Sequence, residues 1–176
     1  MEPHDIVFHA DIHGAPFVLI KTEGKKPPEQ TMKESAQLAA AYSKAWGDLL
    51  SSVNVYWVSP EQVSKTPPTG QYLKKGAFLI SGSKNYVRNV PLEAAIGIKT
   101  EDAQSRVIGG PVEAIAKQAE VYVELKPGRQ KSGQLAKRIR EVLAKRALEV
   151  LRKQILDIPL EDIQRFIPLG RGALKS

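Results

Sequence analysis

The sequence contains no cysteine, and it has only three histidines among its 176 residues. The absence of thiols excludes disulfide bonds, cysteine-ligated zinc sites and cysteine nucleophiles. Because disulfides are typical of small secreted domains, we expect a reducing, intracellular environment. A chain of this length hides roughly two-thirds of its surface on folding, so we expect a sizeable core without such cross-links.

Long hydrophobic runs are also missing. No stretch approaches the roughly 18 consecutive apolar residues of a membrane-spanning helix, and Met1 is followed by the acidic letters EPHD, which are unlike a signal peptide. We therefore expect a soluble, cytoplasmic protein without a membrane partner.

Acidic residues are absent from residues 62–92 and scarce in residues 126–153. The first segment carries five Lys or Arg and no Asp or Glu, and the second carries ten against two. The rest of the chain is acidic or neutral, so the net charge of +7 arises from these two blocks. Two basic blocks on an otherwise acidic chain favour a polyanion as partner, most often a nucleic acid. A solvated surface rich in Lys and Glu is the alternative.

Short β-branched and aromatic runs alternate with helical patterns, which predicts an α+β fold. We expect a mixed, mostly antiparallel sheet with an N-terminal Ala-rich helix and a long basic C-terminal helix. A capping box at Thr31 is expected to open the first helix, and the second is expected over residues 132–154 after a loop. The expected strands include residues 5–10, 16–21, 53–58, 77–81 and 85–90, the last two forming a hairpin.

His9, Asp11 and His13 share one face if residues 9–13 form a strand, and imidazoles with a carboxylate bind zinc or iron. A metal-dependent hydrolase at this triplet is therefore one hypothesis. Gly14 favours a turn at this point, which would move His13 off the face. Asp11 would then accept turn amides and the histidines would be hydrogen-bonded in the core, or the triplet would contact a nucleic acid directly.

Cations and aromatic residues interleave within residues 62–92. Cations neutralise phosphates, and rings stack on unpaired bases. If most of the five cations contacted single-stranded RNA, log K would fall with log salt at a slope of about −3. Alternatively, the tyrosines lie in the core and the lysines only keep an edge strand from pairing. The residues concerned are Lys65, Tyr72, Lys74, Lys75, Lys84, Tyr86 and Arg88.

Motifs for covalent or nucleotide chemistry are not found. The Lys131–Ser132 pair lacks the glycine spacing of a Walker motif, no serine lies in a G-x-S-x-G elbow, and no carboxylate pair occupies an apolar setting. Arg129 and Lys131 precede the N-terminus of the expected helix, which favours an anion near residue 132. We expect no catalytic residues, metal or cofactor.

Four strings in this order, HDIVFHADIHGAPFVLIK, ESAQLAAAYSKAW, VYWVSPEQVSK and TGQYLKKGAFLISGSKNY, resemble the archaeal form of the NFACT-R domain. This resemblance is dense over residues 4–90. It implies an RNA-binding role in ribosome-associated quality control, in which the full-length NFACT (RqcH) proteins engage the large ribosomal subunit and tRNA. The family's motif positions correspond to His9, Asp11, His13, Gly14, Lys21, Tyr56, Trp57, Lys65, Lys84 and Asn85.

The sequence also departs from the family. It lacks the N-terminal glycosylase-like domain, the coiled coil and the strand pair that usually opens this domain. We therefore expect one of three forms: a fragment whose partner is the remainder of a larger NFACT protein, a split gene product that joins a separate partner chain, or a shortened stand-alone form. The expected organisation is an RNA-binding domain over residues 1–130 and a basic helical extension over residues 131–176.

These observations lead to one hypothesis and two alternatives. We expect a non-enzymatic module that binds tRNA or large-subunit ribosomal RNA, with Lys65, Lys74, Lys75, Lys84 and Arg88 on phosphates. Tyr72, Tyr86 or Trp57 would stack a base, and His9, Asp11, His13, Lys21 and Asn85 would line the site. The alternatives are the hydrolase at His9, Asp11 and His13, and a protein-docking module on the ribosome.

Overall fold

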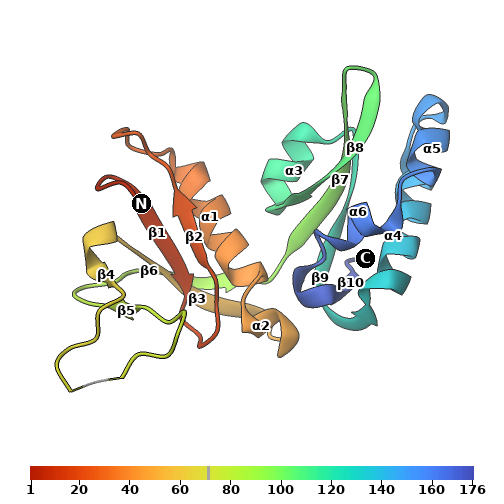
Figure 1. Ribbon diagram of the computed structural model, residues 1–176. Helices are drawn as coiled ribbons and strands as arrows, with labels where there is room; N and C mark the ends of the chain where they lie inside the picture. Colours follow the sequence, from red (N-terminus) through yellow and green to blue (C-terminus); the bar gives the residue numbers. More distant parts are fainter. Residues whose placement is uncertain (71) are drawn as a thin grey trace.

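The structure is a computed structural model that describes residues 1–70 and 72–176, and it has two adjoining lobes (Figure 1). Each lobe is built on a four-stranded antiparallel sheet. The first has the order β2-β1-β3-β6, with β1 (Ile6–Ala10), β2 (Phe17–Ile20), β3 (Ser52–Val58) and β6 (Asn85–Pro91). The second has the order β10-β9-β7-β8, with β7 (Ala94–Glu101), β8 (Gln104–Gly110), β9 (Val121–Lys131) and β10 (Arg171–Leu174).

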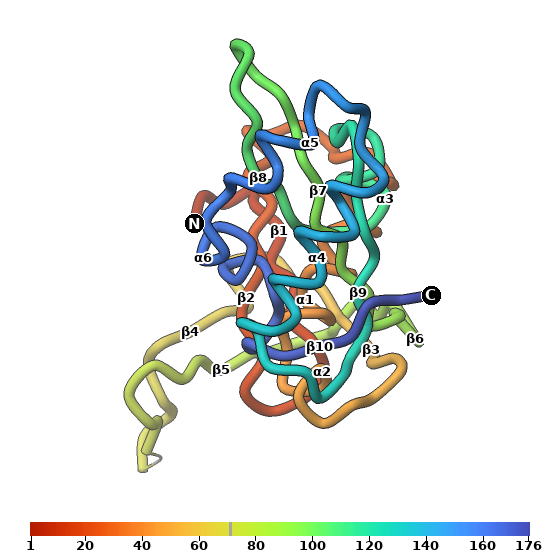
Figure 2. Tube along the Cα trace, turned by 90° about the vertical axis from the view of Figure 1, so that its right-hand side faces the viewer, coloured from red at the N-terminus to blue at the C-terminus, as the bar shows by residue number. Residues whose placement is uncertain are grey.

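Helices and a small strand pair complete the lobes. The first lobe also has α1 (Glu29–Ala41), α2 (Lys44–Gly47), the 3-10 turn η1 (Pro60–Gln62), and the paired β4 (Val63–Ser64) and β5 (Leu79–Ile80). The second lobe has α3 (Val112–Gln118), α4 (Ser132–Arg146), α5 (Glu149–Leu156), α6 (Leu160–Gln164) and η2 (Pro168–Gly170). Figure 2 shows the segment between β4 and β5 projecting from the body of the molecule.

α1 covers one face of the first sheet. Its buried alanines, including Ala36, Ala39 and Ala40, form one core with Phe8 and Val55, because small side chains let the helix approach the strands closely. Strand side chains alternate between faces, so the neighbours of Phe8, namely Val7 and His9, point to the opposite face. That face, which we call the open face, has a smaller core of Val7, Tyr56 and Val58.

Side chains of α1 and of α2 in the first lobe form hydrogen bonds with the second lobe. Trp46 is fully buried, and its indole Nε1 donates to the carbonyl of Arg171 at 2.7 Å. The hydroxyl of Tyr42 donates to the carbonyl of Phe166 at 2.8 Å, and the side chain of Gln37 accepts from the amide of Val112. α1 therefore lies between the first sheet and the second lobe, and the open face points away from that lobe (Figure 1).

The predicted α+β class with mostly antiparallel sheets is confirmed, but several details differ. α1 begins at Glu29, because Pro28 occupies the N-cap position and Thr31 lies inside the helix. Residues 77–81 and 85–90 do not form a hairpin, since β5 pairs with β4 and β6 pairs with β3. The expected loop after residue 126 is instead the continuation of β9, which pairs with the unpredicted β10.

The expected helix over residues 132–154 is broken after Arg146. Ala147 and Leu148 are extended, and α5 then begins at Glu149. At 100° per residue, an unbroken helix would turn Leu151 and Ile155 away from the face that buries Leu135 and Ile139. The break lets both side chains reach the core.

The expected division at residue 130 does not coincide with a gap between the sheets. β9 crosses this position and pairs with β10, so the second sheet joins residues on both sides of it. Among the described residues, no helix is long and apolar enough to cross a lipid bilayer.

Candidate nucleic-acid interface

A row of rings crosses the open face of the first sheet. Cross-strand register places Phe17 and Tyr56 on either side of His9, and Tyr86 on the far side of Tyr56. Ring centroids are 4.9 Å apart for His9 and Phe17, 5.6 Å for His9 and Tyr56, and 5.9 Å for Tyr56 and Tyr86. Phe78 extends the row by packing edge-on against Phe17 at 4.9 Å. We call these five side chains the aromatic row.

Cations lie over three members of the aromatic row. The Nζ atom of Lys84 is 4.2 Å from the ring centroid of Tyr56, and that of Lys65 is 5.4 Å from Phe78. The guanidinium of Arg88 is 4.8 Å from Tyr86. Cations over aromatic faces are attracted by the ring quadrupole. The open face therefore offers positive charge and π-surfaces side by side, which is the combination that binds single-stranded nucleic acid.

Exposure differs along the aromatic row. Tyr86 is 40% exposed, whereas Tyr56 is only 4% exposed. Phe17 and Phe78 are half-buried at the other end. Tyr86 and the two phenylalanines are therefore accessible to a base, whereas the buried Tyr56 packs against the neighbouring rings.

His9 is held by hydrogen bonds on both ring nitrogens. Its Nε2 lies 3.0 Å from the carbonyl of Ala15, and its Nδ1 lies 3.4 Å from the hydroxyl of Tyr56. Since a carbonyl only accepts, Nε2 carries the proton and Nδ1 accepts from Tyr56 in the neutral ring. Burial lowers the pKa of His9, and burial followed by the nearby Asp11 carboxylate raises the pKa of Tyr56. Both groups are therefore neutral at physiological pH and act as a fixed polar pair.

The His9, Asp11 and His13 triplet does not form a metal-binding arrangement in the structure. His13 lies exposed in the turn after β1, and the carboxylate of Asp11 is 4.0 Å from the ammonium of Lys84. Within residues 1–70 and 72–176, no group of three His, Cys, Asp or Glu residues could hold a metal ion. Because His9 already uses both nitrogens, the geometry gives no support to the hydrolase hypothesis.

Trp57 is separated from the aromatic row by the sheet. It lies opposite Phe8 in the pairing of β1 with β3, so it shares the face covered by α1 and packs against that core. The exposed side chain of Asn85 donates to its carbonyl at 3.2 Å. The alternation of β3 therefore assigns Tyr56, rather than Trp57, to the open face.

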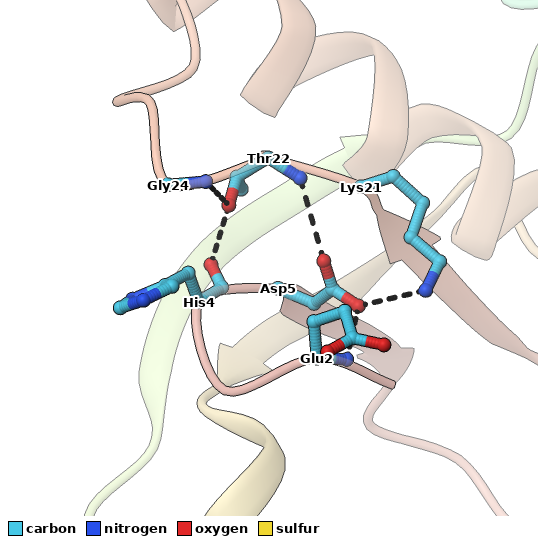
Figure 3. A network of polar contacts seen from close by, with 6 residues as sticks. All are labelled: Glu2, His4, Asp5, Lys21, Thr22 and Gly24. Carbon is cyan, nitrogen blue, oxygen red and sulfur yellow. Dashed lines mark hydrogen bonds and ion pairs between the residues drawn. The ribbon is translucent and has the colours of Figure 1, made fainter.

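Lys21 lies at the opposite end of β1 from Asp11. Figure 3 shows its ammonium paired at 3.0 Å with Asp5, whose side chain is 1% exposed and also accepts from the amide of Glu2. The hydroxyl of Thr22 donates to the carbonyl of His4 in the same network. The Glu2 amide, followed by Lys21 and Thr22, lowers the pKa of Asp5. This network ties the first residues to the end of β2, so Lys21 has a structural partner there.

The loop between β4 and β5 carries the remaining predicted residues. Tyr72 is 88% exposed, and Lys74 and Lys75 are exposed beside it. Lys65, Lys74 and Lys75 line one hollow of about 270 Å³ together with Phe78. Through Phe78, this hollow adjoins the end of the aromatic row.

Three members of the aromatic row were not among the site residues expected from sequence: Phe17, Phe78, and Tyr56, which was named only as a family motif position. Phe17 could have been found, because a hairpin that turns at residues 11–16 places it opposite His9. Phe78 could not, since it reaches the row from a loop whose path depends on tertiary contacts.

The first part of the chain, residues 1–82, matches the NFACT protein RNA binding domain. Residues 1–82 belong to this family. The NFACT match includes β1 to β5 and the loop between β4 and β5, which carries Lys65, Lys74 and Lys75 and which we call the basic loop. Just beyond the match, β6 with Tyr86 and Arg88 completes the first sheet.

Relatives of the chain include proteins of archaea and animals. The archaeal Rqc2 homolog aRqcH of Methanocaldococcus jannaschii is 40% identical over 166 residues, which cover 94% of this chain and 23% of that protein. The ribosome quality control complex subunit NEMF homolog of Drosophila melanogaster is 42% identical over 106 residues, covering 58% of this chain and 11% of that protein. The chain thus spans less than a quarter of these relatives.

Among solved structures, the C-terminal part of the fibronectin/fibrinogen-binding protein from Streptococcus suis is similar. The identity is 26%, the TM-score is 0.41, and the similarity covers 58% of this chain and 34% of that one.

Proposed function

We propose that this chain is a non-enzymatic RNA-binding module that acts at cytoplasmic ribosomes in quality control, with tRNA or large-subunit ribosomal RNA as its ligand. The proposal is supported by the NFACT membership of residues 1–82 and by the Drosophila relative, which is named as a ribosome quality control complex subunit. The observation that carries it is the aromatic row with cations over its rings.

The open face suits a single-stranded segment of RNA. Tyr86 and the half-buried phenylalanines present π-surfaces on which unpaired bases stack. Lys84 and Arg88 lie beside these rings, where they can contact the phosphates that connect stacked bases. His9 and Tyr56 keep the row in place through their hydrogen bond.

The basic loop extends this surface. Lys65, Lys74 and Lys75 around one hollow attract phosphates, and the exposed Tyr72 offers a further ring. Because rings stack on every base, we expect sequence-tolerant binding with strong salt dependence.

A direct test is the affinity of the full chain for a fluorescent single-stranded RNA of about 12 nucleotides, measured by anisotropy. Stacking on one ring contributes about 1–3 kcal/mol per base, so Tyr86→Ala should weaken binding about 5- to 150-fold. Tyr86→Phe keeps the ring and should retain most of the affinity. Equal affinities for the wild type and Tyr86→Ala would refute a stacking role for the open face.

Competition experiments separate the candidate ligands. Unlabelled tRNA and a large-subunit ribosomal RNA fragment should each displace the probe if they use the open face. A chain that binds no naked RNA, yet binds isolated ribosomal proteins, would instead be a protein-docking module.

A further inference from the structure

The second lobe carries a concentration of unpaired positive charge. Residues 126–146 contain eight Lys or Arg and a single acid, Glu141. Among the described residues, none of these eight cations forms an ion pair. Elsewhere in the described part of the lobe, Lys99, Arg106, Arg152, Arg165 and Lys175 are paired, whereas Lys117, Lys153 and Arg171 are not. Arg140 and Arg146 donate to the carbonyls of Ile158 and Tyr122, so it is mainly the charge of the other six cations that is available to an external anion.

Helix geometry gathers three of these cations on the solvent face of α4. Leu135, Ile139 and Leu143 are fully buried, so positions about 180° away point outward. Lys137 lies about 160° from the middle of this buried stripe, Arg138 about 100° and Lys145 about 120°, and all three are exposed. The exposed Glu141 lies between them, so the net charge of this part of the helix is +2. They span eight residues, or about 12 Å along the helix axis. We call these three residues the α4 face.

Two more cations meet where α4 begins. Lys131 precedes the first helical residue, and β-pairing places Arg171 directly opposite it. Like charges opposite each other on neighbouring strands destabilise a sheet, and the first turn of α4 contains no acid to offset them. An anion at this end would relieve the repulsion, so the free protein retains an arrangement that favours a polyanionic partner.

The α4 face lacks the rings that characterise the open face. The exposed large aromatic side chains of the described residues are Tyr72 and Tyr86, and both lie in the first lobe. Cations without a stacking surface contact the backbone of a nucleic acid rather than its bases. Paired RNA presents its phosphates and 2′-hydroxyls while its bases remain stacked inside the helix.

The two surfaces lie on opposite sides of the molecule. α1 separates the first sheet from the second lobe, and α4 lies on the side of that lobe far from β1 and β2 (Figures 1 and 2). We propose that the α4 face binds the backbone of a paired RNA segment, so that one chain bridges this segment and a single strand held on the open face. The duplex contact stands independently of the proposed function, whereas the bridging rests on it.

The test compares two triple variants of the full chain that lose the same charge. Lys137→Gln/Arg138→Gln/Lys145→Gln removes the α4 face, and Lys33→Gln/Lys44→Gln/Lys117→Gln removes exposed helical lysines elsewhere. The probes are an RNA duplex of about 20 base pairs and an oligouridine of about 12 nucleotides. We expect the α4 variant to bind the duplex about tenfold more weakly and to bind oligouridine as the wild type does. The slope of log K against log salt for the duplex should flatten by about 2 to 3.

Unchanged duplex binding in the α4 variant, or the same loss in both triple variants, would overturn the duplex contact. Binding of the wild type to anionic lipid vesicles but not to the duplex would overturn it as well. Bridging is measured by energy transfer between a donor-labelled duplex and an acceptor-labelled oligouridine. If both probes bind the chain but no energy transfer occurs, the bridging proposal is overturned. Tyr86→Ala should lower the affinity for oligouridine and leave the affinity for the duplex unchanged. The proposed role of the open face can therefore fail without the proposed role of the α4 face failing, and the reverse.

Discussion

The ammonium group of Lys84 lies 4.2 Å from the ring centroid of Tyr56 and 4.0 Å from the carboxylate of Asp11. The side chain of Lys84 is 32% exposed, so the cation is partly held by the protein and partly accessible. Because Tyr56 also donates to His9, this single lysine connects the turn after β1 with the centre of the aromatic row.

Replacing Lys84 tests whether this cation serves RNA binding or only the fold. Lys84→Gln should weaken single-stranded RNA binding about 3- to 10-fold. Because one phosphate contact is lost, the slope of log K against log salt (the salt slope) should flatten by about 0.7. Its melting temperature should change little, because a partly exposed ion pair contributes at most about 1 kcal/mol. Lys33→Gln, which removes an exposed lysine on α1, is the matched control and should bind RNA normally.

Reversing Lys74 and Lys75 tests the basic loop. Lys74→Glu/Lys75→Glu should weaken RNA binding by at least tenfold, because two attractive charges near the aromatic row become repulsive. The salt slope should flatten by about 1.4, as two phosphate contacts disappear. Titrations at several salt concentrations measure both quantities.

The adjacent exposed pair Lys25 and Lys26 supplies the control with the same change of charge. Lys25→Glu/Lys26→Glu lies in the loop between β2 and α1 and should have a much smaller effect. Similar losses in the two double variants would mean that net charge, not the position of the loop, governs binding.

The half-buried His9 should make the free energy of unfolding depend on pH just below neutrality. Its pKa in the folded state is lowered by burial from the ordinary value of 6.5, so the unfolded chain binds more protons between the two values. Stability should therefore be constant above the ordinary pKa and should fall as the pH drops from 6.5 toward the folded pKa. Urea unfolding at a series of pH values between about 7.5 and 5 measures this trend.

His9→Gln should abolish the change in this window, although it lowers stability at every pH. His13→Gln should leave the trend as it is in the wild type, because His13 is exposed in the turn. A pH profile of His9→Gln parallel to that of the wild type would exclude His9 as its source.

Gly109 leaves room for Phe166, which follows α6, to pack against β8. A Cβ atom at this position would lie 2.6 Å from the Cβ of Phe166, which is too close for two non-bonded carbon atoms. Gly109→Ala should therefore cost about 1–3 kcal/mol of unfolding free energy by overpacking. At Gly133 the nearest atom is 3.4 Å away, so Gly133→Ala should be close to neutral in the same denaturation experiment. A neutral Gly109→Ala would mean that Phe166 does not rest on β8.

Much of the local structure followed from the sequence. The strands around residues 5–10, 16–21 and 53–58 were predicted within about one residue, because alternation and β-branched residues act over neighbouring positions. The strings around HADIHGAP and VYWVSPEQ also carried the NFACT resemblance, which the family match over residues 1–82 confirms. The two basic blocks were evident from composition alone, and their roles in RNA binding stay predictions.

Only the tertiary structure decided which side chains meet. His9, Tyr56 and Tyr86 come from strands far apart in sequence, and their register aligns them in one row while β3 turns Trp57 to the other face. Period-two alternation divides a strand into two faces, but it does not say which face a distant helix covers. That choice depends on α1, whose alanines pack under Phe8 and leave the other face open. The break between α4 and α5 has the same origin, since burial of Leu151 and Ile155 outweighs the local tendency of residues 132–154 to remain one helix.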